Sequence, residues 1–168
     1  MATTYYLISS QTLATTTSSV TFSSIPQTYT DLVLKMSVRD TVATSSANIK
    51  ITFNGSASSY SERLLLGTGS AAASANQSTT YMNYIYSNAA NDTASTFSNG
   101  EMYIPNYAGA NNKSVSVDSV SENNATVAYT ALDAGLWSNT AAITSITLTS
   151  VTLFAQYSTF YLYGIKNS

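Results

Sequence analysis

The stretch DLVLKMSVRD, residues 31–40, changes side-chain character at almost every step. One side of an extended chain would carry Leu32, Leu34, Met36 and Val38. The other side would carry Val33, Lys35, Ser37 and Arg39. Because successive side chains of a β-strand point to opposite faces, this period of two predicts a strand with one buried face.

The same alternation continues along the chain. NIKITFNG, residues 48–55, would bury Ile49, Ile51 and Phe53, and its Asn-Gly pair is a strong turn signal. In TYMNYIYS, residues 80–87, either face could be the buried one. Further predicted strands are YYLIS and SVTFS near the start, GEMYIPNY (100–107), KSVSVDSV (113–120), NATVAYTALDAGLW (124–137), AITSITLTS (142–150) and YSTFYLYGI (157–165).

Two stretches read as loops, and part of the predicted strand 124–137 could instead hold a helical turn. Residues 67–80 are small and polar, and residues 87–100 are rich in Asn and Ser. YTALDAGLW, residues 129–137, is the closest approach to a helical spacing. In the last strand, Phe160 and Leu162 are expected to be buried and Tyr161 and Tyr163 to face outward.

Eight to ten short strands at this spacing predict an all-β fold, an antiparallel β-sandwich. A jelly roll is the most specific expectation, because two sheets of four strands suit this length, while a closed barrel or an immunoglobulin-like sandwich stays open. The 168 residues are expected to form a single domain, residues 1–168.

The composition removes much of the usual catalytic chemistry. The chain has no histidine and no cysteine, so histidine acid–base catalysis, thiol nucleophiles and most zinc sites lack their usual groups. Charged residues are 8% of the chain, against about 25% in an average protein, and the net charge is −2. We therefore expect no cofactor, no metal, no nucleic-acid partner and no membrane partner. The N-terminal residues do not resemble a signal peptide.

The eight carboxylates are the remaining candidates for chemistry. A glycosidase needs two of them across a cleft, but none lies in an acid-dense, aromatic segment, and we expect no enzyme. Asp31 is expected to make local hydrogen bonds in a turn. Asp92 with Asn88 and Asn91 could offer oxygen ligands to calcium, although an Asn-rich turn is the preferred interpretation.

The thirteen tyrosines suggest a binding surface. Six of them gather in two segments, residues 81–86 and 157–163, and exposed tyrosines provide large contact areas or stack on sugar rings. The alternative is a rim of half-buried core tyrosines. Trp137 is expected to fill the core. The candidate interface residues are Tyr81, Tyr84, Tyr86, Tyr103, Tyr161 and Tyr163.

Four segments of this chain resemble small structural proteins of tailed bacteriophages, cyanophages included. These are SSVTFSSIPQTYTDLVLKMSVRD (18–40), YIPNYAGANNKS (103–114), GLWSNTAAITSITL (135–148) and YSTFYLYGIKN (157–167). The resemblance implies a jelly-roll-like component of the virion, made in the host cytoplasm. It would be a capsid decoration (cement) protein that binds the major capsid protein as a homo-oligomer, most plausibly a trimer. The alternative is a tail-fibre module that binds host glycans.

Overall fold

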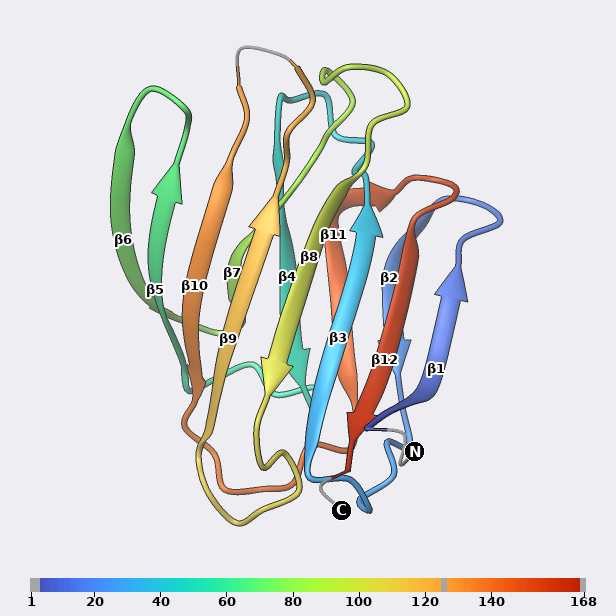
Figure 1. Cartoon of the computed structure of the whole chain (residues 1–168), viewed down its shortest axis with the longest axis vertical. Coiled ribbons are helices and arrows are strands. Elements are labelled where there is room, and N and C mark those ends of the chain that lie inside the picture. Colours follow the sequence, from blue (N-terminus) through green and yellow to red (C-terminus); the bar gives the residue numbers. More distant parts are fainter. Residues whose placement is uncertain (1–3, 125–126, 167–168) are drawn as a thin grey trace.

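Every regular element in the described part of the chain is a β-strand. The computed structural model describes residues 4–124 and 127–166 (Figure 1). These residues form no helix long and apolar enough to cross a membrane. The strands are β1 (Tyr5–Thr12), β2 (Thr17–Phe22), β3 (Asp31–Val38), β4 (Ala47–Phe53), β5 (Tyr60–Gly67), β6 (Ala72–Thr79), β7 (Met82–Ser87), β8 (Ser98–Ile104), β9 (Lys113–Val120), β10 (Thr130–Trp137), β11 (Ile146–Phe154) and β12 (Thr159–Ile165).

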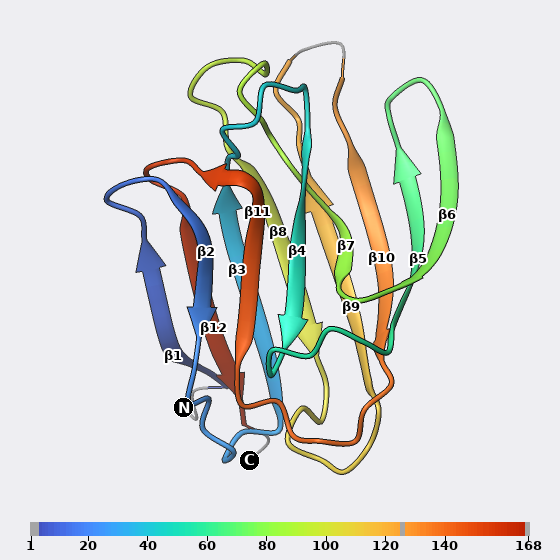
Figure 2. The ribbon, with the colours of Figure 1, turned by 180° about the vertical axis from the view of Figure 1, so that it is seen from behind.

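The strands form two unequal antiparallel sheets packed face to face, which confirms the predicted β-sandwich. The large sheet has eight strands in the order β1-β12-β3-β8-β9-β10-β5-β6, and the small sheet has four in the order β2-β11-β4-β7. Figure 2 shows the small sheet in front of the large one. Strands far apart in the sequence pair in a nested way, β1 with β12, β2 with β11, β3 with β8 and β4 with β7.

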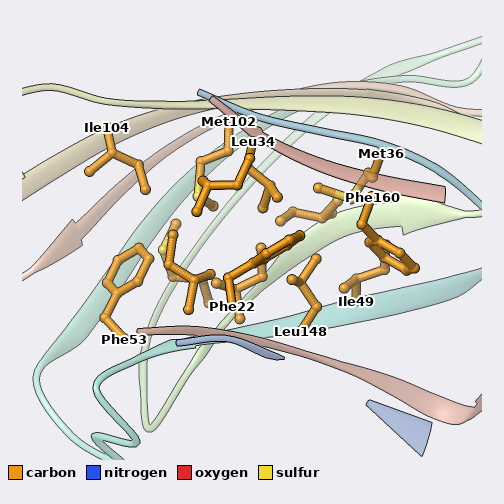
Figure 3. Packing of buried hydrophobic residues seen from close by; sticks show 14 of the residues in the cluster. Phe22, Leu34, Met36, Ile49, Phe53, Met102, Ile104, Leu148 and Phe160 are labelled. Atoms are coloured by element: carbon orange, nitrogen blue, oxygen red, sulfur yellow. The ribbon is translucent and has the colours of Figure 1, made fainter. Parts of the chain in front are cut away.

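The core lies between the two sheets and is made by the alternating apolar residues. Figure 3 shows Leu34, Met36 and Phe160 of the large sheet lying over Phe22, Ile49, Phe53 and Leu148 of the small sheet. The inward positions predicted for residues 31–40 and for Phe160 and Leu162 are confirmed, since all these side chains are buried. Trp137 also fills the core as predicted, with its ring centroid 5.7 Å from that of Phe53.

Two predictions about single segments are wrong, and one strand is not predicted at all. Most of the predicted loop 67–80 is strand β6, and residues 60–67, for which we predict no element, form β5. The signal of β6 is weak because its residues are small and six of the eight are exposed, so neither face is marked as apolar. The strand predicted within 124–137 is present as β10, whose inward residues are Ala131, Asp133, Gly135 and Trp137, so the alternative of a helical turn at 129–137 is wrong. Residues 125–126 of the predicted strand 124–137 lie outside the described part.

An irregularity in β7 explains why its buried face could not be chosen from the sequence. The pairing with β4 shifts between Ile49 and Ile51, so that Ile49 lies opposite Ile85 and Ile51 opposite Met82. Met82 and Ile85 belong to opposite faces of a regular strand, but both are fully buried here. A β-bulge thus brings both apolar side chains of this strand into the core.

The free edge of β7 is closed by side chains that point inward from the large sheet. The backbone N–H groups of Asn83 and Tyr84 donate to Oε1 of Glu62, at 2.8 and 3.2 Å. The N–H of Tyr86 donates to Oγ of Ser119 at 3.2 Å. The small sheet therefore ends at β7, and strands β5 and β6 extend beyond it (Figure 1).

Gly164 in the last strand leaves room for an aromatic ring. A Cβ atom at this position would lie 2.3 Å from Cγ of Tyr29, a distance that real Cβ contacts do not reach. Tyr29 precedes β3, and its ring also lies 5.8 Å from that of Tyr6. The glycine therefore allows the segment between β2 and β3 to close the end of the sandwich.

We expect Gly164→Ala to lower the free energy of unfolding by about 1–3 kcal/mol, because the ring of Tyr29 must move away. Urea denaturation followed by tryptophan fluorescence measures the change. Gly67→Ala is the matched control, since its Cβ would meet only the carbonyl oxygen of Thr130 at 3.9 Å. Equal stability of the Gly164 and Gly67 variants would contradict the proposed role of the ring contact.

Candidate protein-contact face

The outer face of the large sheet carries an aromatic patch across neighbouring strands. The register places Leu7, Tyr163, Val33 and Tyr103 side by side on β1, β12, β3 and β8. The ring of Tyr163 lies 6.2 Å from that of Tyr5 and 6.4 Å from that of Tyr161. Val33 is only 1% exposed although it points away from the core, which indicates that its neighbours cover it. We call these residues the tyrosine patch: Tyr5, Leu7, Val33, Tyr103, Tyr161 and Tyr163.

The charged groups around the tyrosine patch are paired with neighbouring side chains through ion pairs and hydrogen bonds. Nζ of Lys35 lies 2.7 Å from Oε2 of Glu101 on the neighbouring strand, and the hydrogen bond to Glu101 raises the pKa of Lys35. The hydroxyl of Tyr103 donates to Oδ2 of Asp31 at 2.8 Å, and this bond raises the pKa of Tyr103. Asp31 also accepts the N–H of Asn106, so its partners are distant in the sequence and the prediction of local turn bonds is wrong. A surface whose charges are already paired is less costly to desolvate.

Two leucines continue the face toward β6. Leu65 of β5 and Leu132 of β10 are cross-strand partners, and each is more than half exposed. They line a shallow hollow of about 240 Å³ together with Gly67, Ala72 and Thr130. A second hollow of about 140 Å³, which includes Tyr103 and Leu132, connects this leucine pair to the tyrosine patch. Tyrosine patch and leucine pair together form what we call the contact face.

The outer face of the small sheet has a different chemistry. Its exposed or half-buried positions are mainly hydroxyl and amide groups, and the hydroxyls of Thr21 and Thr147 hydrogen-bond to each other at 3.0 Å. The two sides of the sandwich therefore differ, and apolar side chains concentrate on the large sheet. Exposed apolar patches of this kind mark interaction sites more often than hydroxyl-rich surfaces do.

The structure separates the six predicted interface tyrosines into two groups. Tyr103, Tyr161 and Tyr163 lie together in the tyrosine patch, whereas Tyr81, Tyr84 and Tyr86 lie on or beside β7 in the small sheet. All three tyrosines of the β7 group are half-buried. In this second group, the ring of Tyr86 stacks on Tyr129 at 4.7 Å and the ammonium group of Lys50 lies 4.7 Å from the centre of the Tyr81 ring.

The sequence missed the leucine pair and the N-terminal part of the face. Leu65 is the middle of three consecutive leucines, so no alternation marks which one points outward. Leu132 lies in the predicted strand 124–137, where Ala131, Asp133 and Gly135 at the inward positions give no apolar contrast. Both positions become visible only when the register of β10 with β5 places them opposite each other.

A pair of buried carboxyl groups lies behind this face, inside the sandwich. Glu62 is fully buried, and its Oε2 accepts a hydrogen bond from the side chain of Gln77 while Oε1 accepts the N–H groups of β7. Asp133, which is 4% exposed, contacts Glu62 from the neighbouring strand. Among the described groups, the carboxyl of Glu62 and the backbone N–H of Arg63 are the ones that hydrogen-bond to Asp133.

The surroundings of Asp133 favour its protonated form. Three groups donate hydrogen bonds to Glu62, whereas the backbone N–H of Arg63 is the donor that acts on Asp133, and it lowers the pKa of Asp133 less than the other causes raise it. Burial, together with the hydrogen bond and the charge of Glu62, raises the pKa of Asp133 to about 8. Asp133 is therefore protonated at neutral pH and shares its proton with Glu62. In this arrangement the pair anchors β7 to the large sheet.

The loop around Asp92, where the sequence offered a calcium site as an alternative, is organised by an arginine side chain. The loop from Asn88 to Ser98 folds around the guanidinium group of Arg39, which donates to the carbonyl oxygens of Thr93 and Thr96 at 2.9 Å. Oδ2 of Asp92 accepts the N–H of Ala89 at 2.7 Å. Within the described ranges, no three acidic residues gather in a way that could hold a metal ion. A side-chain cation thus occupies the centre of this loop.

We expect Asp133 to make stability depend on pH in a defined window. The pKa of Asp133 is about 8 in the folded protein and near 3.8 in the unfolded chain. Between pH 4 and pH 8 the folded state therefore binds one proton more than the unfolded state. The stabilisation is complete below pH 4 and is lost as the pH rises to about 8, at about 1.4 kcal/mol per pH unit.

Asp133→Asn removes the titrating group but keeps a donor to Glu62, so its stability relative to the wild type should increase from pH 4 to pH 8. Urea denaturation at a series of pH values measures this difference. Asp118→Asn, on the exposed outer side of β9, is the control and should show no such trend. A pH-independent difference for Asp133→Asn would show that Asp133 is already ionised in the fold.

Comparisons with known proteins add no relative: no model of a protein family, no curated protein and no solved structure matches this chain. The resemblance of its segments to phage structural proteins therefore stays a prediction.

Proposed function

We propose that this protein is a structural component of a bacteriophage virion and that it decorates the capsid through its contact face. The main support is the concentration of exposed apolar side chains on one sheet, above all the cross-strand pair Leu65 and Leu132. The resemblance of four segments to phage structural proteins supplies the assignment to a virion. The partner would be the major capsid protein.

The nested strand pairing supports the more specific fold expectation. If β5, β6, β9 and β10 are set aside, the remaining eight strands pair first with last, second with second-last and so on inward. We infer a jelly roll whose one sheet has been widened by two added hairpins. The added strands carry the leucine pair, so the widening itself creates that part of the contact face.

Decoration would work by adhesion. Burying an exposed leucine stabilises a complex by about 1.5–3 kcal/mol, and tyrosines add large, rigid contact areas. Protein that bridges neighbouring capsid subunits would stabilise the shell, because it binds the assembled state and not the dissociated one. The buried carboxyl pair has a place in this scheme as a structural anchor, and we propose no catalytic role for it.

A second candidate function is the binding of host glycans by a tail-fibre module. A polar hollow of about 140 Å³ lies at one end of the sandwich, lined by Thr68, Glu122 and Tyr129 among others. Tyr129 also stacks on Tyr86, and an aromatic ring beside polar groups is a common setting for a sugar. This hollow includes Gly67, Thr68 and Gly69, at the start of the stretch 67–86 that we propose as the rim of the glycan site.

We expect the double variant Leu65→Gln, Leu132→Gln to bind capsids stripped of this protein at least about tenfold more weakly than the wild type. Sedimentation of capsids with bound protein measures the affinity. Val151→Gln is the matched control, because Val151 is also about half exposed but belongs to the small sheet. Undiminished binding of the double variant would exclude the leucine pair from the contact.

The glycan candidate is tested separately on an array of bacterial surface polysaccharides. Binding by the wild type that Tyr129→Ala abolishes, and that the leucine variant retains, would favour the tail-fibre function. Absence of glycan binding together with loss of capsid binding by the leucine variant would favour decoration.

A further inference from the structure

The four edge strands of the sandwich are not equally protected. A strand edge exposes unpaired N–H and C=O groups, and proteins block such edges with bulges, charges, short strands or inward-pointing side chains. Strand β1 has an irregularity between Leu7 and Ser9. Strand β2 is short, and its pairing with β11 is interrupted. The edge of β7 is closed by Glu62 and Ser119.

Strand β6 lacks all of these protections. Its eight residues, AASANQST, pair with β5 without any shift of register, from Gly67 opposite Ala72 to Tyr60 opposite Thr79. It contains no charged residue and no proline, and six of its residues are exposed. Because β6 extends beyond the small sheet, neither of its faces is covered by a second layer (Figure 2).

We propose that β6 pairs with β6 of a second copy of this chain, antiparallel, around a two-fold axis perpendicular to the sheet. The side chains of β6 are too small to form pockets that would select a foreign strand, and no charge selects a partner of opposite sign. Recognition would therefore rest on the backbone ladder. A regular, uncharged strand is complementary to itself in this orientation, and small side chains allow the two sheets to continue into each other.

The symmetry of the contact supports a pair of copies over a chain of them. Pairing β6 with β1 of another molecule would join opposite ends of the large sheet and would not close, which produces fibres. A contact between β6 and β6 of a second copy closes at the dimer, because both β6 edges are then paired. The pairing also does not specify a trimer, so the oligomer expected from the phage resemblance would need a different contact.

The orientation of the two copies has a consequence for the contact face. Rotation about an axis perpendicular to the sheet leaves both outer faces on the same side. One strand, β6, separates Leu65 from the axis, and two strands, β5 and β6, separate Leu132 from it. The leucine pairs of both copies would therefore lie on either side of the axis. The dimer would present two contact faces to one flat target, which raises the apparent affinity. The pairing itself does not depend on the proposed function.

Sedimentation equilibrium of the purified chain tests the pairing. A single ladder between two strands is a small interface, so we expect a reversible dimer that forms between about 10 µM and 1 mM. Asn76→Glu places one negative charge of each copy near the axis, and the two charges repel. Within each molecule, Arg63 is the cross-strand partner of position 76, and its positive charge keeps the variant folded. We expect this variant to dimerise at least about tenfold more weakly. Gln11→Glu on the exposed part of β1 is the matched control and should dimerise like the wild type.

Crosslinking locates the contact independently of affinity. The chain has no cysteine, so Ser74→Cys, Ala75→Cys and Asn76→Cys each introduce a single thiol, and at least one should form a disulfide dimer on mild oxidation. Ser10→Cys on β1 should not. A chain that stays monomeric up to 1 mM, or a dimer that Asn76→Glu leaves intact, would overturn the proposal. So would a dimer that crosslinks through Ser10→Cys and not through β6.

Discussion

The unequal width of the two sheets governs most features of this protein. Four strands can cover only part of an eight-stranded sheet, so the small sheet must end over the interior of the large one. A sheet edge that ends there would leave buried N–H groups without partners, which is costly. The side chains of Glu62 and Ser119, which point inward from the large sheet, accept hydrogen bonds from the backbone N–H groups of β7 and so remove this cost. The overhang of β5 and β6 and the free edge of β6 follow from the same mismatch.

The carboxyl pair is a consequence of that solution. A buried glutamate without a cation needs several donors, and two β7 N–H groups and Gln77 supply them. Asp133 beside it is buried next to the carboxyl of Glu62 and therefore keeps its proton at neutral pH. Their arrangement ties the proton affinity of Asp133 to the joint between the two sheets.

The sequence predicted those parts of the fold in which one face of a strand is apolar. The strands around Ile51 and Phe160 alternate strictly because one side meets the core and the other meets solvent, and the strand around Leu34 alternates from Leu34 onward. It failed where this contrast is absent. Strand β6 is exposed on both faces, and β10 has Ala131, Asp133 and Gly135 at its inward positions, so the period of two is hidden.

The candidate site was predicted in part, for a similar reason. Tyrosines are conspicuous in a sequence, and Tyr103, Tyr161 and Tyr163 were chosen on residue type alone; the register of β8, β3 and β12 brings them to one face. Leu65 and Leu132 resemble core residues, and only the pairing of β5 with β10 shows that they point outward. The Glu62–Asp133 contact joins residues far apart in the sequence and has no local signal.

Cryo-electron microscopy of the intact virion would show which surface of this protein contacts its partner. We expect density for this chain on the capsid shell, with the outer face of the eight-stranded sheet against the major capsid protein and Leu65 and Leu132 buried in the contact. A particle in which this face points to solvent, or in which the chain is found only on the tail, would contradict this expectation.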